Sequence, residues 1–353
     1  MKVKVGEITK IKTGKLDANA SSADGKYPFF TCSKDPLRIN SYSYDCECVL
    51  VAGNGDLNVK YYNGKFDAYQ RTYIIEDNSN GLLYMPYLYH FLEGYIGELR
   101  KQSIGGVIKY IKLGNLTDVL VELPSIEEQK YIVNLMNISL ELIELRKKTI
   151  DKLDSLVKAR FIEMFGDGNL PMKTVEELCS CVVDCPHTTP KYEGDLKNPA
   201  IRTSEIKKGF LVWDTMRYVS DKEYVERTTR AIPKAGDIVY GREGTFGNAA
   251  ILPDGYKFCL GQRVMLLRPD YSKCTSEYLL HSVISDEVYR QAIEKNNAST
   301  VAHVNVKDVK QFKVPLPSLD KQNEFANFVK QVDKSRFDIK KSITELEREV
   351  VYD

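Results

Sequence analysis

Three cysteines and a histidine lie close together in the segment CSCVVDCPH, at Cys179, Cys181, Cys185 and His187. Thiolates and imidazoles are the ligands that zinc takes in structural sites, so this cluster could hold a metal ion. No paired C-x2-C module accompanies it, and the remaining cysteines are scattered along the chain. Ordinary reduced, buried thiols are therefore the favoured interpretation, and a zinc site is the alternative.

A second group, Asp270, Asp308 and Lys310, resembles the carboxylates and lysine with which a nuclease holds a metal beside a phosphate. The pattern is short and arises readily by chance. The chain also contains no G-x4-G-K-[ST] phosphate loop and no Rossmann glycine fingerprint. We therefore predict that this chain has no catalytic residues, with a metal-dependent nuclease as the alternative.

Polar loops offer a different chemistry, because Arg, Lys, Asn, Gln, His and Tyr can read base edges and grip phosphates. In the first half of the chain the candidate DNA-binding residues are Lys34, Arg38, Asn54, Lys60, Tyr61, Tyr62, Gln70, Arg71, Lys101, Gln102 and Ser103. In the second half they are His187, Thr188, Thr189, Lys191, Tyr192, Arg242, Thr245, Asn248, Gln262, Arg263, Asn296 and Asn297. Ordinary solvated loops are the alternative interpretation.

An internal repeat indicates how these loops are positioned. Residues 108–129 read IKYIKLGNLTDVLVELPSIEEQ and align, at an offset of 193, with residues 301–322, VAHVNVKDVKQFKVPLPSLDKQ. At nearly the same offset Gln70-Arg71 aligns with Gln262-Arg263. A pair that recurs in both copies is expected to serve a shared task, either a phosphate contact or a structural link. Most other side chains have diverged, as expected if each copy reads something different.

Each copy begins with a globular part, residues 1–123 or 168–316. Short runs such as CVLVAG (48–53) and RVMLLRP (263–269) are bounded by Gly, Asn, Asp or Pro, which predicts strands and turns. Residues 85–100 and 276–295 have the pattern of helices. The expected fold class is α+β, with two globular α/β parts related as a pseudo-twofold repeat.

The second part of each copy, residues 124–167 or 317–353, is predicted to be a long helix. Ser125 and Glu128 form a capping box after Pro124, and Ser318 occupies the matching place in the second copy. The first apolar stripe is Ile132, Met136, Ile143, Ile150, Leu153, Val157 and Met164, and the second is Phe325, Val329, Val332, Ile339, Ile343, Leu346 and Val350. Narrow stripes on rods of about 60 Å favour an antiparallel coiled coil. Packing of each rod on its own globular part is the alternative.

The composition is that of a soluble protein large enough for two domains. The chain has 353 residues, of which 43% are hydrophobic, and its net charge of +1 is low for a protein that binds phosphates alone. It lacks an apolar run long enough to span a membrane, and its first residues lack an apolar signal core. We expect a cytoplasmic protein without a membrane partner.

Taken in order, these segments resemble the specificity subunit of a type I restriction–modification system. The resemblance rests on LPSIEEQ and LPSLDKQ before the two helices, on KLDSLVKARFIEMFGD (152–167), and on AGNGDLNVKYYNGKFDAYQRTYIIE, DCPHTTPKY and YGREGTFGNAAILP. It covers essentially the whole chain. It implies target recognition domains at 1–123 and 168–316 and conserved spacer helices at 124–167 and 317–353.

The resemblance also implies a function and partners. Each recognition domain would read one half of a split double-stranded DNA target, and the helix pair would fix the distance between the halves. Two modification subunits, which carry S-adenosylmethionine, would bind this chain, and restriction subunits would add ATP and Mg²⁺ chemistry. The chain itself would hold no cofactor. One departure is that the second helix ends in LEREVVYD, without the RFIEMFGD of the first. A structural adaptor that binds proteins is a further alternative.

Overall fold

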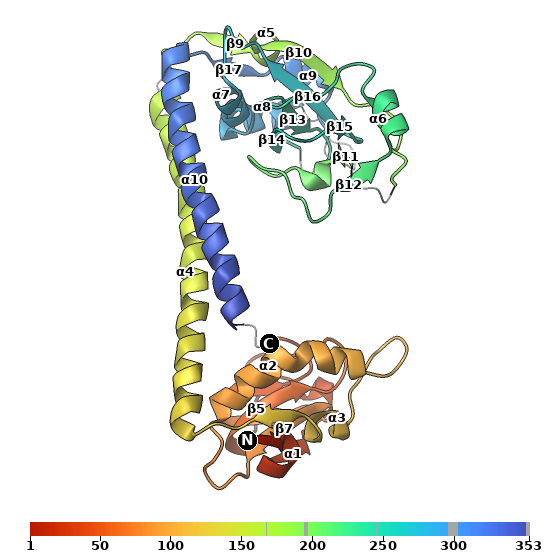
Figure 1. Cartoon of the computed structure of the whole chain (residues 1–353), viewed down its shortest axis with the longest axis vertical. Helices are drawn as coiled ribbons and strands as arrows, with labels where there is room; N and C mark the ends of the chain where they lie inside the picture. Colours follow the sequence, from red (N-terminus) through yellow and green to blue (C-terminus); the bar gives the residue numbers. More distant parts are fainter. Residues whose placement is uncertain (167, 194–196, 245, 296–302, 351–353) are drawn as a thin grey trace. The chain divides into compact units, whose positions relative to one another are not determined.

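The structure is a computed structural model that describes residues 1–166, 168–193, 197–244, 246–295 and 303–350. The chain divides into two compact units, residues 1–148 with 340–353 and residues 149–339. Each unit contains one globular part and a portion of both long helices (Figure 1). None of the helices in the described part of the chain is long and apolar enough to cross a membrane.

The first globular part is built around a six-stranded sheet with the order β2-β7-β5-β6-β3-β4. Its strands are β2 (Thr9–Thr13), β3 (Tyr27–Phe30), β4 (Leu37–Ile39), β5 (Tyr44–Ala52), β6 (Val59–Ala68) and β7 (Thr72–Asp77). The β3–β6 pair is parallel, and the others are antiparallel. A separate pair joins β1 (Lys2–Lys4) to β8 (Leu120–Glu122). Its helices are α1 (Val5–Ile8), the 3₁₀ turn η1 (Ala18–Ala20), α2 (Met85–Gln102) and α3 (Leu113–Thr117).

The second globular part repeats this strand order in two pieces. One sheet has the order β10-β16-β13-β14, and the other β12-β11-β15. The strands are β10 (Cys179–Asp184), β11 (Asn198–Ile201), β12 (Arg217–Val219), β13 (Ile238–Gly241), β14 (Ala249–Ile251), β15 (Cys259–Leu260) and β16 (Val264–Pro269). The pair of β9 (Met172–Thr174) with β17 (Lys313–Pro315) matches β1–β8. The β14 and β15 strands take the places that the single strand β6 fills in the first part.

The helices of the second part match those of the first, with one difference. They are α5 (Val175–Leu178), η2 (Thr203–Glu205), α6 (Asp221–Arg227), α7 (Ser276–Val283), α8 (Asp286–Lys295) and α9 (Val306–Lys310). The sequence pattern of residues 276–295 predicted one helix, but the structure has two. Ser285 begins the second helix, because its Oγ accepts a hydrogen bond of 3.2 Å from the Val288 N–H. The predicted α+β repeat is otherwise confirmed.

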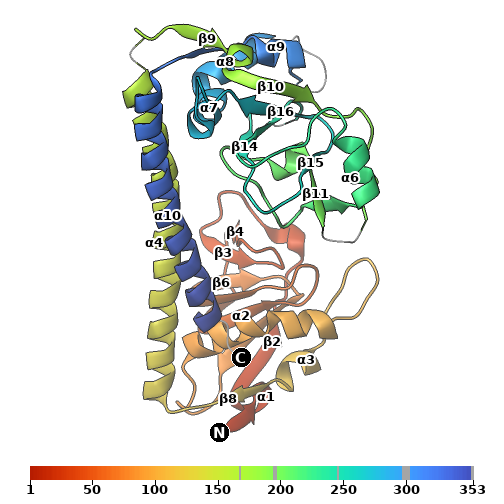
Figure 2. The same cartoon turned by 45° about the horizontal axis from the view of Figure 1, so that its top comes forward.

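Buried apolar side chains hold each globular part together. In the first part α2 lies across β5 and β6, and its Leu88 and Leu92 are fully buried with Val49 and Ile75 (Figure 2). In the second part α7 packs on β14 and β16, and Tyr278 is buried with Tyr240 and Met265. Residues of the long helices complete both cores, since Val133 joins the first and Val157 the second.

The two long helices are α4 (Ile126–Phe165) and α10 (Leu319–Val350), of 40 and 32 residues. They lie side by side and antiparallel (Figure 1). Within the second unit Arg160 lies 2.8 Å from Glu324, and within the first Arg146 donates to the Ser342 carbonyl at 3.3 Å. The predicted capping box is present, with the Glu128 N–H donating to Ser125 Oγ at 3.3 Å. Every predicted stripe residue with a described side chain is buried or half-buried.

A buried glutamine fastens each long helix to its globular part. Gln129 Oε1 accepts from the Tyr84 N–H at 2.8 Å, and its Nε2 donates to the carbonyls of Leu82 and Pro124 at 2.8 and 2.9 Å. Its repeat partner is equally buried and makes the same bonds. Gln322 Oε1 accepts from the Thr275 N–H at 2.9 Å, and its Nε2 donates to the carbonyls of Lys273 and Pro317, both at 3.0 Å. We call each set a glutamine clamp.

Candidate nucleic-acid interface

Three chain segments meet at the same place in both globular parts. In the first part the Gly53 N–H donates to the Arg71 carbonyl at 2.8 Å, and the Ile111 N–H donates to the Gly53 carbonyl at 2.9 Å. In the second part the Arg242 N–H donates to the Arg263 carbonyl at 2.9 Å, and the Val304 N–H donates to the Arg242 carbonyl at 3.0 Å. We call this arrangement the three-segment junction. It holds the recurring Gln-Arg turn against the end of the central strand.

The recurring Gln-Arg pair therefore has a structural task in its backbone. Gly53 is required there, because a Cβ on it would lie 2.4 Å from the Arg71 carbonyl oxygen. Arg263 has a φ of +65°, a left-handed conformation that costs a non-glycine residue roughly 1–2 kcal/mol. The side chains of Gln70, Arg71 and Arg263 are exposed, and that of Gln262 is half-buried, so they can contact a ligand.

In the second part the junction surrounds a hollow of about 170 Å³. Its lining includes four of the predicted residues, His187, Arg242, Gln262 and Arg263, together with Cys185, Pro186 and Glu243. Two carboxylates fix the basic groups. Asp184 lies 2.8 Å from an Arg242 terminal nitrogen and 3.3 Å from His187 Nε2. Glu243 lies 2.8 Å from Arg263 Nε and 3.3 Å from His303 Nδ1. The terminal nitrogens of Arg263 remain directed to donate.

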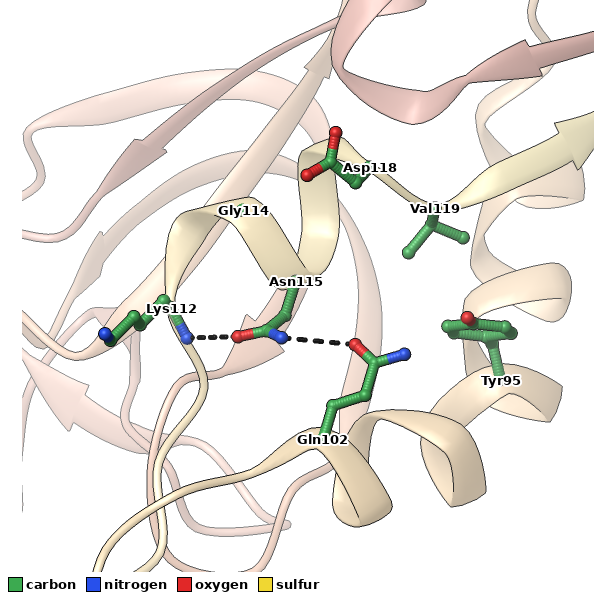
Figure 3. Close-up of a pocket in the computed structure, with 7 residues that line it drawn as sticks. All are labelled: Tyr95, Gln102, Lys112, Gly114, Asn115, Asp118 and Val119. Atoms are coloured by element: carbon green, nitrogen blue, oxygen red, sulfur yellow. Dashed lines mark hydrogen bonds between the residues drawn. The ribbon is translucent and has the colours of Figure 1, made fainter.

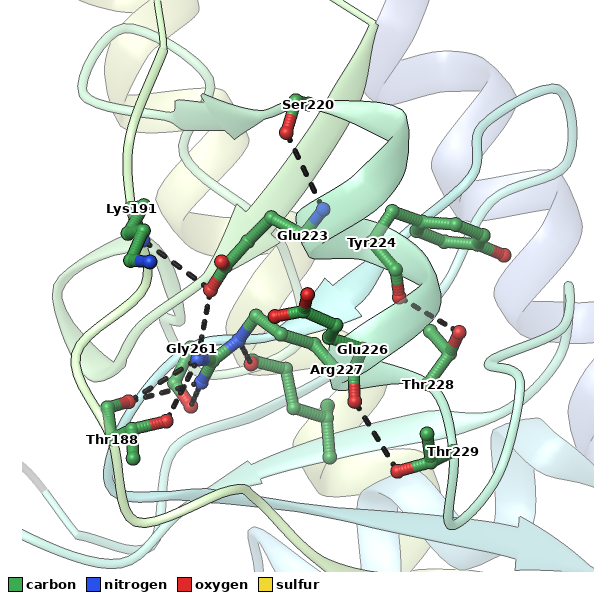
Figure 4. A network of polar contacts seen from close by, with 11 residues as sticks. Thr188, Lys191, Ser220, Glu223, Tyr224, Glu226, Arg227, Thr228, Thr229 and Gly261 are labelled. Atoms are coloured by element: carbon green, nitrogen blue, oxygen red, sulfur yellow. Dashed lines mark hydrogen bonds and ion pairs between the residues drawn. The ribbon is translucent and has the colours of Figure 1, made fainter.

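A buried arginine holds the loop at residues 186–192 beside this hollow (Figure 4). Arg227 of α6 is 5% exposed, and its guanidinium donates to the carbonyls of Leu260, Gly261 and Thr188 at 2.9, 3.0 and 3.2 Å. Glu223, one turn earlier, accepts from the Lys191 N–H at 3.3 Å. These bonds tie the loop to the residues just before Gln262. His187, Thr188, Thr189 and Lys191 are thereby presented with exposed side chains.

Two of the predicted residues in the second part are better described as structural. Arg242 is 5% exposed and ion-paired with Asp184, so we leave it out of the proposed contact set. Tyr192 is half-buried, with the guanidinium groups of Arg217 and Arg202 at 5.0 and 5.8 Å from its ring centre. Asn248 donates to the Ile206 carbonyl at 3.2 Å. Thr245, Asn296 and Asn297 lie outside the described residues.

In the first part the predicted residues are more dispersed. Asn54 lies at the junction, opposite Tyr110 in a β-bridge. Tyr61 donates to Glu47 at 2.7 Å, and Lys60 is half-buried, with burial lowering the pKa of its ammonium group. The Tyr62 ring packs on Phe30 and Phe66, so packing accounts for this residue and we remove it from the contact set.

The remaining predicted residues of the first part lie away from the junction. Lys34 and Arg38 are exposed in the β3–β4 region, while Lys101, Gln102 and Ser103 end α2. Gln102 lines a hollow of about 300 Å³ between α2 and α3, where its Oε1 accepts from Asn115 Nδ2 at 3.1 Å (Figure 3). Asn115 in turn accepts from the Lys112 N–H at 2.8 Å. This chain of bonds braces the start of α3, and Gln102 is tied to it.

The two candidate catalytic or metal sets have other partners. Burial raises the pKa of the Cys179 thiol well above its usual range, which opposes the thiolate that zinc requires. In the described ranges no group of three or more His, Cys, Asp or Glu residues could hold a metal ion. Asp270 pairs with Lys273 at 2.8 Å, which holds the pKa of its carboxyl at about 2, whereas Lys310 pairs with Glu176 at 2.9 Å.

Two repeated α+β parts with equivalent polar junctions, carried by one antiparallel helix pair, define a two-domain DNA-recognition protein. Residues 1–155 and 182–348 match the family described as the type I restriction modification DNA specificity domain, and the chain belongs to this family. This family recognises DNA and is not catalytic.

Curated relatives are named as specificity subunits. The EcoDI specificity subunit of Escherichia coli is 29% identical over 94% of this chain and 80% of its own length. The MjaVIII specificity subunit of Methanocaldococcus jannaschii is 20% identical over 94% of this chain and 85% of its own length.

Solved structures share the fold. The S subunit of a type I restriction–modification system from M. genitalium matches with a TM-score of 0.54 at 15% identity, covering 99% of this chain and 93% of that chain. A chain from a structure of type I R-M complex assembly matches with a TM-score of 0.62 at 16% identity, covering 99% and 95%. Both likenesses concern the fold alone.

Proposed function

We propose that this chain is the specificity subunit of a type I restriction–modification complex and reads a bipartite double-stranded DNA target. The observation that carries the proposal is the three-segment junction, which has the same backbone bonds in both globular parts but different side chains around it. A shared frame with divergent polar groups suits two domains that read different sequences. The first recognition domain is residues 1–123, and the second is 168–316.

The proposed contacts divide into positioning and reading groups. Arg71 and Arg263 hold equivalent backbone positions and serve as phosphate contacts in both halves. The reading groups are the exposed polar side chains that differ between the copies. In the first domain these are Lys34, Arg38, Asn54, Gln70, Lys101 and Ser103. In the second they are His187, Thr188, Thr189, Lys191 and Gln262. Each good base contact contributes about 1–3 kcal/mol of discrimination.

An exposed apolar stripe on α4 is the proposed docking surface for a modification subunit. Tyr131, Leu135, Ile138 and Leu142 recur at steps of four, three and four residues and are 64, 45, 46 and 39% exposed. This spacing places them on one face of the helix, where an apolar helix of another chain can pack. Two modification subunits supply S-adenosylmethionine and methylate adenine, and restriction subunits supply ATP- and Mg²⁺-dependent steps. This chain itself holds no cofactor.

Exchange of the first recognition domain tests the function. The chain is co-expressed with its modification subunit, and methylated sites are identified by long-read sequencing of cellular DNA. Replacing residues 1–123 by the first recognition domain of another family member should change one half of the methylated target and leave the other half and the spacing unchanged. Retention of both half-sites after the exchange would rule the proposal out.

A control experiment addresses the nuclease alternative. The purified chain alone should neither cleave nor methylate DNA with Mg²⁺ or S-adenosylmethionine present. Cleavage that is lost in Asp308→Ala would favour the nuclease, and no crosslinking to DNA even in the full complex would favour a protein adaptor.

A further inference from the structure

The loop between α2 and α3 exposes an unusual amount of apolar surface. Ile104, Val107, Ile108 and Tyr110 are 43, 104, 63 and 37% exposed. The loop projects from the end of α2 beside α3 (Figure 2). Exposed apolar side chains are common singly, but four within seven residues form a patch, and such patches mark interaction sites. We call residues 104–110 the apolar hairpin.

The apolar hairpin is braced rather than loose. The Ile104 N–H donates to the Tyr110 carbonyl at 3.0 Å, and the Tyr110 N–H returns a bond of 2.8 Å to the Ile104 carbonyl. Gly105 allows the turn, since its φ is +115° and a Cβ there would lie 2.6 Å from the Ile108 carbonyl oxygen. Two hydrogen bonds at its base therefore present Val107 and Ile108 at the tip in a fixed direction.

The hairpin adjoins the first three-segment junction directly. The Gly55 N–H donates to the Lys109 carbonyl at 2.9 Å, and Asn54 forms a β-bridge with Tyr110. The apolar tip is therefore continuous with the residues that we propose to contact DNA.

The charge around the tip favours a nucleic acid over a protein partner. From Arg100 to Lys112 the chain has four basic residues and no acidic residue. Arg100 and Lys101 form ion pairs with Asp56 and Glu98 at 2.9 and 2.6 Å. Lys109, by contrast, is exposed beside the tip. An apolar tip flanked by lysines matches the chemistry of side chains that enter between base pairs while cations hold the phosphates.

The second copy differs in sequence at the matching positions. At the repeat offset, Ile104, Val107 and Ile108 align with Asn297, Thr300 and Val301, and the aligned segment 293–305 has one lysine and one glutamate. Only the first copy carries both the apolar tip and the excess of basic residues.

We propose that Val107 and Ile108 form a wedge that inserts between neighbouring base pairs of the half-site read by the first recognition domain. Insertion unstacks one base step and bends the duplex there, and the half-site read by the second domain remains stacked. The free energy of burying the tip offsets the loss of stacking, so flexible steps such as TA or CA are favoured at that position. This inference rests on the proposed function.

The test uses the complex of this chain with its modification subunit, bound to a duplex that carries its methylated target. 2-Aminopurine, whose fluorescence rises when it is unstacked, replaces single purines that are not methylated, one position at a time in each half-site. We expect a rise of about twofold or more at one step of the first half-site only. Val107→Ser with Ile108→Ser should remove that rise and weaken binding, while Lys109→Gln should weaken binding and preserve it.

Each outcome has a defined meaning. Equal fluorescence in the two half-sites, or a signal unchanged by the double substitution, would overturn the wedge. Loss of the modification subunit from the double variant without a change in fluorescence would also overturn it and would assign the tip to a protein contact. Failure of the proposed function is distinguishable, because no bipartite duplex would then be bound or methylated. Both substituted side chains are exposed, and hence the variant is expected to fold.

Discussion

Arg227 is the single residue on which the loop of the second recognition domain most depends. It donates to three backbone carbonyls from two separate segments while nearly fully buried. The sequence gives no signal for this role, because its neighbours VERTTRA look like an ordinary polar helix end. Its importance arises from the path of the chain at residues 188 and 260–261.

Arg227→Met should therefore abolish recognition of the second half-site. It removes the donors while keeping a similar length, and each carbonyl left unsatisfied costs about 1–3 kcal/mol. We expect methylation to become indifferent to the second half-site, or to be lost, together with a lower unfolding midpoint. Arg227→Lys should fail as well, since an ammonium group cannot reach three carbonyls in a plane. Sequencing of methylated DNA and thermal unfolding measure both effects, and full specificity in Arg227→Met would contradict them.

Arg71 and Arg263 are expected to contribute affinity without specificity. Arg71→Ala and Arg263→Ala should weaken binding to cognate and unrelated duplexes by similar factors. Each should reduce the slope of log affinity against log salt by about 1, since one phosphate contact is lost. Titration of the complex with DNA at several salt concentrations measures this. A changed target sequence in either variant would assign the arginine to base reading instead.

Residue types in loops predicted part of the candidate site. Gln70-Arg71 and Gln262-Arg263 do lie at equivalent junctions, because the recurrence reflected a real backbone link. Tyr62 and Arg242 have the side chains of DNA readers but are held by packing and by an ion pair. Composition does not distinguish the two cases, since burial depends on contacts made far along the chain.

At the scale of elements, the glutamine clamps attach the recognition domains to the long helices. Gln129→Ala should leave the Tyr84 N–H and two carbonyls without partners and destabilise this attachment by about 1–3 kcal/mol or more. Amide hydrogen exchange at Tyr84 should accelerate, and exchange at Thr275 should not change. Gln322→Ala serves as the matched control, with the opposite pattern. Equal exchange at Tyr84 before and after the Gln129 substitution would show that the clamp is dispensable.

The apolar stripe on α4 gives a second prediction at this scale. Leu135→Asp with Leu142→Asp should prevent co-purification of the modification subunit, because two charges cannot be buried against an apolar helix. Asn134→Asp with Lys148→Asn makes the same change in net charge at exposed polar positions and should retain the subunit. If both double variants bind equally well, the docking surface lies elsewhere.

The elements were largely predictable because their signals are local. Apolar spacing and the Ser125–Glu128 box predicted the long helices, and alternating β-rich runs predicted the central strands. The replacement of β6 by β14 and β15 was not predictable, because residues 252–258 carry no pattern that separates a broken strand from a loop. The break between α7 and α8 was missed because Ser285 is an N-cap inside an otherwise continuous helical pattern.

At the scale of the whole molecule, acid should weaken the second unit first at His281. This ring packs against Phe161 and Phe325, with ring centres 6.1 and 5.1 Å apart, and burial lowers its pKa from 6.5 to about 4. The unfolded chain then binds a proton that the folded chain excludes. Stability is thus full above pH 6.5 and is lost as the pH falls toward 4.

Thermal unfolding between pH 7.5 and 4.5 measures this dependence. His281→Gln, which has no titrating group, should unfold at a midpoint that falls less steeply over the same range. Parallel curves for the two proteins would exclude His281 as the source.

The glutamine clamps have a consequence for how such proteins change over time. Every partner of Gln129 and Gln322 is a main-chain atom. A main-chain socket places no demand on the side chains of the domain that supplies it, as long as the backbone follows the same path. The joint is therefore interchangeable, and whole recognition domains can be traded between genes at LPSIEEQ and LPSLDKQ without redesigning the helices, which allows new specificities to arise by recombination in one step.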